Sequence, residues 1–86
     1  MHIQIVSPKG TLYEGDLLYA VFPGVAGEFA VYPDHAPIIS SLKKGAIRCV
    51  ASEQSEEAVE VEGGFVEVNE NKVTVCVETH GGASRT

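Results

Sequence analysis

The stretch from Phe22 to Pro37 reads Phe-Pro-Gly-Val-Ala-Gly-Glu-Phe-Ala-Val-Tyr-Pro-Asp-His-Ala-Pro, and it constrains the backbone more than any other part of this chain. Glycine can supply positive φ, whereas proline fixes φ near about −65° and removes an amide donor. Proline-bounded corners therefore enclose a Gly-Glu-Phe turn and define a particular backbone path. No catalytic group in the stretch has an evident partner. We interpret the segment as built for shape and contact.

Alternation of apolar and polar residues continues outward from this stretch along most of the chain. Ile3 and Ile5 alternate with polar neighbours, and residues 73–77 repeat the same period of two. This period is typical of half-buried strands in antiparallel sheets. Turn residues interrupt the strands at Pro8–Gly10, Pro23–Gly24, Lys43–Gly45, Gly63–Gly64 and Asn69–Asn71. The pattern predicts an all-β fold: a flattened antiparallel β-sandwich or barrel of about ten short strands.

The chain has 86 residues, which is enough for one small domain and no second core. We expect this β-sandwich domain to occupy residues 1–79, because the apolar spacing stops there, and residues 80–86 to form a flexible polar tail. In the strand after the Gly-Glu-Phe turn, parity sends Phe29 and Val31 into the core and leaves Glu28, Ala30 and Tyr32 outside.

The net charge is −6, and seven of the twelve acidic residues lie between Glu53 and Glu70. We interpret that acidic region as a solvated hairpin. A surface of this sign repels phosphate, so the composition argues against nucleic-acid binding and against direct insertion into anionic lipid. No apolar run approaches the roughly 20 residues that span a bilayer. The start of the chain lacks the regions of a signal peptide, and we expect a cytoplasmic protein.

Side chains that could carry chemistry are present but do not form a recognisable active site. The histidines His2, His35 and His80 are far apart in sequence, and those near the chain ends are expected to be solvated. Cys49 and Cys76 lack Cys-x-x-Cys spacing and are interpreted as free thiols. We expect no catalytic residue, no metal, no cofactor and no small-molecule substrate. For His35, the interpretation is a ring hydrogen-bonded to the backbone of its corner, with partner contact as the alternative.

Lys43-Lys44-Gly45 raises an alternative function, because biotinyl and lipoyl carrier domains are β-sandwiches of similar length modified on a lysine at a hairpin tip. Those domains usually present the lysine as Met-Lys-Met or Asp-Lys-Ala, whereas this chain reads Leu-Lys-Lys-Gly. A plain basic turn is the preferred interpretation. An unrelated β-sandwich binding module is the other alternative.

Two blocks of sequence carry a specific resemblance. The first runs from Val21 to Pro37, and the second contains Val61-Glu-Gly-Gly-Phe-Val-Glu-Val68 followed by Asn71-Lys-Val-Thr-Val75. Together, and in this order, they resemble the epsilon subunit of F-type ATP synthases, and the likeness covers nearly all of residues 3–79. The resemblance implies a flattened barrel of about ten strands. It also implies a non-catalytic subunit of the central stalk, beside the gamma subunit and against the membrane c-ring, on the cytoplasmic face of the membrane.

In this family the subunit clamps gamma to the ring, so that ion flow turns the shaft and drives ATP synthesis. Carried over by position, the resemblance places Gly27 and Glu28 against the c-ring. It places Ser7, His35 and Ser40 toward gamma. An exposed ion pair between Glu28 and a basic ring residue would contribute only about 0.2–1 kcal/mol, so broader contacts must supply most of the grip.

The sequence departs from the family pattern at two kinds of position. The family often has glycine where Ala30 and Asp34 stand, although Asp34 can still adopt a turn conformation. Typical members also continue into a helical hairpin that can inhibit ATP hydrolysis, and this sequence stops at Thr86. If Thr86 is the natural end, helix-mediated inhibition is expected to be absent; if the chain is a piece of a longer one, that expectation does not hold.

Overall fold

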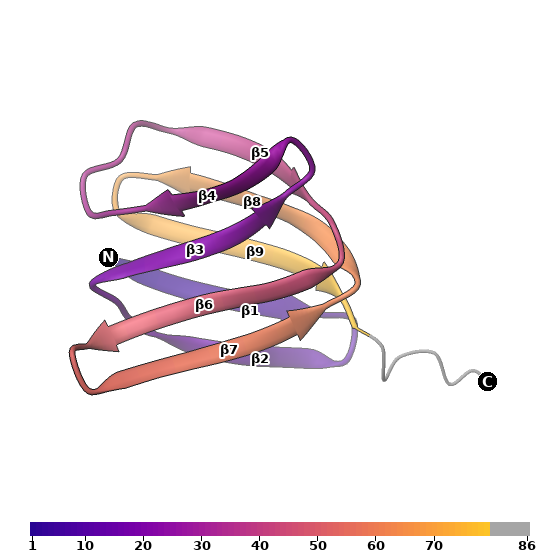
Figure 1. Cartoon of the computed structure of the whole chain (residues 1–86), viewed down its shortest axis with the longest axis horizontal. Coiled ribbons are helices and arrows are strands. Elements are labelled where there is room, and N and C mark those ends of the chain that lie inside the picture. The colour runs from indigo at the N-terminus through magenta and orange to yellow at the C-terminus, as the bar shows by residue number, and fades with distance from the viewer. Residues whose placement is uncertain (80–86) are drawn as a thin grey trace.

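The computed structural model describes residues 1–79, which form nine strands and no helix (Figure 1). The period of two in the sequence accounts for these strands, because each alternates between an interior and an exterior side chain. Their bounds are β1 (His2–Ser7), β2 (Gly10–Asp16), β3 (Tyr19–Gly24), β4 (Gly27–Val31), β5 (Ile38–Leu42), β6 (Gly45–Ser52), β7 (Ser55–Val61), β8 (Gly63–Asn69) and β9 (Lys72–Glu78).

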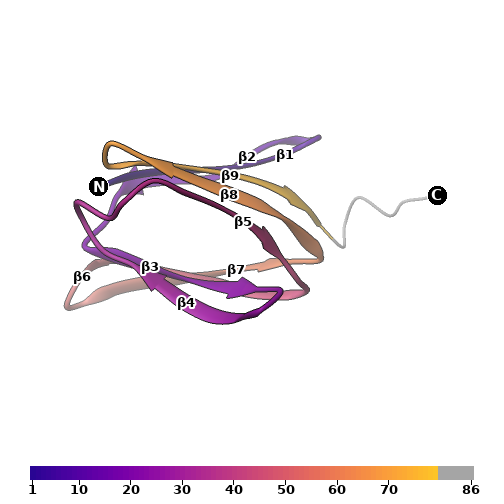
Figure 2. The ribbon, with the colours of Figure 1, turned by 90° about the horizontal axis from the view of Figure 1, so that it is seen from above.

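The strands belong to one sheet in the order β2-β1-β9-β8-β5-β3-β6-β7, with β4 added to β3. Figure 2 shows that this sheet folds over into two layers, with β1, β2, β8 and β9 in one and β3, β4, β6 and β7 in the other. The predicted β-sandwich is therefore confirmed, with nine strands in the described part of the chain. One pairing departs from the predicted antiparallel arrangement, because β1 and β9 pair in parallel.

The space between the layers is filled by apolar side chains from nearly every strand. Ile3 and Ile5 of β1 and Val73 and Val75 of β9 are buried, as their alternation predicts. Phe22 is the largest fully buried side chain. The strand pattern thus places one side of each layer in a common core and leaves the other side free for contacts.

The prediction for the strand after the Gly-Glu-Phe turn is right for one of its two core residues. Val31 is fully buried, whereas Phe29 is only partly buried and packs against the margin of the core. Its ring stacks on that of Phe22 with centroids 5.5 Å apart. Phe29 lies in β4 two residues after Gly27, beside the turn that joins β3 to β4.

Turn chemistry follows the sequence closely. The β8–β9 hairpin turns at Glu70 and Asn71 with φ of 52° and 63°, and Asp34 adopts φ of 66° between β4 and β5. Left-handed backbone is tolerated by Asn and Asp better than by most residues, and the sequence already suggested both turns. The acidic β6–β7 hairpin is largely exposed, as expected, and both cysteines are free thiols, with Cys49 buried.

Candidate interaction surface

The outer face of the layer containing β5, β8, β9 and β1 changes from apolar to polar along the strands. Cross-strand pairing aligns Ser41, Phe65, Cys76 and Val6 in one row across these four strands. The next row contains Ile39, Glu67, Thr74 and Gln4. Because alternate residues of a strand share a face, these rows form one continuous surface opposite the core. We call this surface the outer face.

The apolar end of the outer face is hollowed into an open groove of about 650 Å³. Its lining residues come from strands that are distant in sequence but adjacent in the sheet. They are Val6, Ser7, Pro8, Ile39, Ser41, Gly64, Phe65, Cys76, Val77 and Glu78. The lining is mostly apolar and includes two hydroxyls and one carboxylate, so the groove suits an apolar protein surface that also carries polar groups.

Two large apolar side chains in this groove are exposed to solvent. Ile39 is 76% exposed and Phe65 is 49% exposed. Isolated exposed apolar residues are ordinary, but these two share a concave surface with further apolar groups. Such a concentration is typical of a surface that another protein covers.

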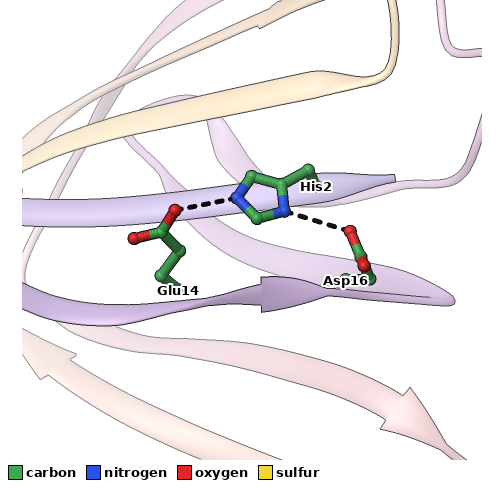
Figure 3. Close-up of polar contacts among 3 residues, drawn as sticks. All are labelled: His2, Glu14 and Asp16. Atoms are coloured by element: carbon green, nitrogen blue, oxygen red, sulfur yellow. Dashed lines mark hydrogen bonds and ion pairs between the residues drawn. The ribbon is translucent and has the colours of Figure 1, made fainter.

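The opposite end of the outer face carries a charged cluster around His2 (Figure 3). The His2 ring lies between two carboxylates of β2, with Nε2 3.0 Å from Glu14 Oε2 and Nδ1 3.0 Å from Asp16 Oδ1. Both carboxylates accept hydrogen bonds when both ring nitrogens are protonated. The hydrogen bonds to Glu14 and then to Asp16 raise the pKa of His2 above its usual value. Each ring nitrogen bonds to a different carboxylate, so the His2 ring bridges Glu14 and Asp16.

The hairpin joining β3 to β4 presents the first pair of predicted site residues. Glu28 is exposed and pairs across the hairpin with Pro23, while Gly27 adopts φ of 136° at the end of the turn. The hairpin tip is fixed to β5, because the Val25 amide donates to the Ser41 carbonyl at 3.1 Å. Val25 itself is 61% exposed. The sequence therefore builds a short, braced projection with a carboxylate and an apolar side chain at its end.

The remaining predicted site residues lie in three different settings. Ser7 lines the groove, and its Oγ accepts from the Lys9 amide at 3.1 Å. Ser40 lies between the groove residues Ile39 and Ser41 in β5, and alternation turns its side chain to the opposite side of the strand. His35 is outside the groove lining, in the corner between β4 and β5. Its Nδ1 donates to the Ala36 carbonyl at 2.7 Å, as the backbone interpretation predicted.

Sequence reasoning missed the residues that dominate the groove. Parity already contained a signal for Phe65: Val66 and Val68 alternate with Glu67 and are buried, so Phe65 must face outward with Glu67. The adjacent pair Ile38-Ile39 contained another, since consecutive strand residues face opposite sides. The cluster at His2 was also missed: this residue was expected to be a solvated chain-end histidine, but pairing of β1 with β2 brings both carboxylates to it.

The fold and the surface together define a small β-sandwich domain with an exposed apolar groove on one of its layers, a feature typical of protein-docking surfaces. Residues 1–81 match the family model described as ATP synthase, Delta/Epsilon chain, beta-sandwich domain. The chain belongs to this family.

Curated relatives agree with that assignment. The chain is 38% identical over 79 residues to the ATP synthase epsilon chain of Polaromonas naphthalenivorans, covering 92% of this chain and 57% of the relative. It is 40% identical over 77 residues to that of Desulfitobacterium hafniense, covering 90% and 58%. The chain thus spans less than two thirds of the length of these relatives. Across residues 1–79, no helix is long and apolar enough to cross a membrane.

Solved structures share the fold at low sequence identity. A chain in the cryo-EM structure of Euglena gracilis mitochondrial ATP synthase, OSCP/F1/c-ring, aligns with a TM-score of 0.81 and 16% identity, covering 87% of this chain and 48% of that chain. A chain in the Tetrahymena thermophila mitochondrial ATP synthase central stalk/c-ring structure aligns with a TM-score of 0.75 and 13% identity, covering 91% and 63%. These matches support the β-sandwich architecture independently of the sequence family.

Proposed function

We propose that this chain is a non-catalytic, epsilon-type subunit of the central stalk of an F-type ATP synthase. In this role it clamps the gamma subunit to the membrane c-ring, so that ion flow is coupled to rotation and ATP synthesis. It would be a peripheral protein on the cytoplasmic face of the membrane, held there through the complex. Membership of the Delta/Epsilon family supports this role, and the exposed apolar groove is the structural observation that carries it.

The groove is the surface that we assign to gamma. It contains Ser7, one of the positions that the family resemblance places toward gamma, and it adds Ile39 and Phe65 as apolar contacts. Interfaces depend on a few well-packed aromatic and aliphatic side chains surrounded by a polar rim. Phe65, an inner member of its cross-strand row, is an aromatic side chain suited to such a central contact. The charged residues around His2, at the other end of the same face, are suited to the polar rim.

The β3–β4 hairpin is the part that we assign to the c-ring. Its tip is braced by a backbone bond to β5 and by stacking of Phe22 on Phe29. A braced projection transmits torque better than a loose loop, because little of the applied force is spent on deforming it. Glu28 adds a charge at the contact, and since it is exposed its ion pair would contribute only about 0.2–1 kcal/mol.

The alternative functions receive less support. Lys43 and Lys44 form an exposed turn between β5 and β6, which is compatible with a hairpin-tip lysine of a carrier domain. The family match and the epsilon-chain relatives cover almost the whole sequence, however, and favour the stalk subunit. A carrier domain would carry a biotinyl or lipoyl adduct on one of these lysines, which an intact-mass measurement from the native host would reveal.

Binding to purified gamma tests the proposal. Ile39→Ser and Phe65→Ser each remove an apolar side chain from the groove while leaving the core intact. We expect each to weaken gamma binding by about 10- to 100-fold, the range of an interface anchor residue. Val25→Ser is the matched control, because Val25 is also exposed and apolar but lies at the hairpin tip. It should leave gamma binding within about twofold of wild type.

A complementary variant tests the hairpin. Glu28→Lys should reduce ATP-driven ion pumping in reconstituted membranes while leaving gamma binding nearly unchanged. Equal loss of gamma binding and pumping would show that Glu28 is assigned to the wrong surface. Failure of the wild-type chain to bind gamma across a range of salt and pH would overturn the proposed function itself.

A further inference from the structure

The corner between β4 and β5 is joined to the β8–β9 turn by a reciprocal pair of hydrogen bonds. The Asp34 amide donates to Asn71 Oδ1 at 2.6 Å, and Asn71 Nδ2 donates to Asp34 Oδ1 at 2.9 Å. The two residues are 37 positions apart in sequence. Two bonds in opposite directions fix orientation as well as distance, because rotation about either one breaks the other. We call this arrangement the Asp34–Asn71 clasp.

Both members of the clasp adopt left-handed backbone, with φ of 66° at Asp34 and 63° at Asn71. Non-glycine residues are uncommon in this region, and a short polar side chain that bonds locally offsets the cost. Here the Asn71 side chain accepts from the Asp34 backbone amide and donates to the Asp34 carboxylate, so both bonds cross the fold. The clasp therefore gives a reason for Asp at position 34, where the conformation alone would favour glycine.

The two sides of the clasp differ in how they are held. The β8–β9 turn is bonded to the sheet, whereas the corner lies outside it. The Asn71 carbonyl accepts from the His2 amide at 3.0 Å, which ties the β8–β9 turn to β1. Residues 32–37, by contrast, lie outside the strand ladder between β4 and β5. Within the corner, the His35 amide donates to the Tyr32 carbonyl at 3.2 Å. The clasp thus holds an irregular segment against a firmly bonded turn.

We propose that Asn71 is a positioning residue that fixes the corner carrying His35, so that the corner is already shaped for its protein partner before binding. The partner named here is gamma, because the corner leads directly into β5, whose Ile39 lines the groove that we assign to gamma. In that respect the inference rests on the proposed function. If the corner samples other conformations, apparent affinity falls by the fraction of molecules that are competent to bind. Asn71 raises the affinity by raising this competent fraction, and it need not contact the partner itself.

Substitutions separate the clasp from the turn in which Asn71 lies. Asn71→Gly keeps the left-handed backbone and removes both bonds. Glu70→Gly makes the same change in the adjacent turn position, which has φ of 52°, and leaves the clasp intact. Asp34→Asn retains a side-chain oxygen for Asn71 and tolerates the same backbone conformation. It is therefore the conservative variant, and it should keep the amide exchange and the gamma affinity of the wild type.

Two readouts on the full chain test the inference. Amide hydrogen exchange should show faster exchange at Asp34 and His35 in Asn71→Gly, with core amides such as that of Val66 unchanged. Affinity for purified gamma should fall about three- to tenfold in Asn71→Gly and stay within about twofold of wild type in Glu70→Gly and Asp34→Asn.

The outcomes separate this inference from the proposed function. Unchanged exchange at Asp34 and His35 in Asn71→Gly would overturn the clasp, whether or not gamma binds. Faster exchange with unchanged gamma affinity would overturn the positioning role while leaving the proposed function intact. Equal loss of affinity in Glu70→Gly would assign the effect to the turn and overturn the positioning role of Asn71. Failure of the wild-type chain to bind gamma would overturn the proposed function and the partner named here.

Discussion

Replacing Gly64 by alanine tests how tightly β8 and β9 are packed at the edge of the groove. Gly64 has φ of 143°, and a Cβ built on it would lie 2.1 Å from the Cys76 carbonyl oxygen and 2.8 Å from Val77 Cα. Both atoms belong to the β9 backbone, so no side chain can rotate to make room. The two strands must separate by roughly 1 Å for this Cβ to reach even the shortest contact that Cβ atoms make, about 3 Å.

The cost of this substitution has two parts. Placing alanine in a backbone conformation suited to glycine costs about 1–3 kcal/mol. Moving β9 away disturbs the ladder where Gly64 pairs with Val77 and Phe65 with Cys76, and each weakened hydrogen bond costs about 1 kcal/mol. We therefore expect Gly64→Ala to lower the free energy of unfolding by roughly 3–5 kcal/mol, a large fraction of the stability of a small domain.

Gly10→Ala is the matched control, because Gly10 also has positive φ, 131°, but a Cβ there meets nothing within 4 Å. It should cost only the conformational part, about 1–3 kcal/mol. Urea denaturation followed by far-UV circular dichroism measures both variants. A difference of about 2 kcal/mol corresponds to roughly 8–16 °C in melting temperature for a domain of this size. If Gly64→Ala were as stable as Gly10→Ala, this result would contradict the close approach of β8 and β9 at Gly64.

Three further predictions follow from the core and the charged cluster. Phe22→Ala should cost about 3–5 kcal/mol of unfolding free energy and Phe29→Ala about half as much, because only Phe22 is fully buried; equal costs in denaturation would contradict the observed packing. The stabilisation from the His2 cluster should be complete below the ordinary pKa of 6.5 and be lost as pH rises through the raised folded-state pKa. Comparing wild type with His2→Gln should show this difference decreasing as pH increases, and a pH-independent difference would contradict it. Burial raises the pKa of Cys49 to about 11, so in the folded chain Cys49 should be alkylated far more slowly than the partly exposed Cys76; comparable rates by mass spectrometry would contradict this.

The strands and turns could be predicted from sequence because their determinants are local. Alternation in segments such as Val73–Val77 fixed the faces, and the special backbone preferences of Asp34 and Asn71 marked the turns. The parallel pairing of β1 with β9 was not predictable, because it depends on how the two ends of the domain meet after the sheet folds over. Partial exposure of Phe29 escaped prediction for a similar reason: parity gives the face of a residue, not the extent of the layer that covers it.

The candidate surface was predicted less completely than the fold. Ser7 was placed toward gamma by family position, and the structure puts it in the groove. Ile39 and Phe65 could have been assigned to the outer face by parity, but only the assembled sheet brings residues of β5, β8, β9 and β1 into one groove. The His2 cluster likewise requires the register of β1 on β2. Surfaces made from several strands need tertiary structure, whereas strands themselves need only periodicity.

Alkylation of Cys76 in the presence of gamma tests the central claim most directly. Cys76 is a free thiol in the lining of the groove and lies in the same cross-strand row as Phe65, so the wild-type chain carries its own probe. If gamma covers the groove, stoichiometric gamma should slow the reaction of Cys76 with a neutral alkylating reagent by about tenfold or more, because the core of an interface excludes solvent. A stable complex with gamma in which Cys76 reacts as fast as in the free chain would contradict the assignment of the groove to gamma.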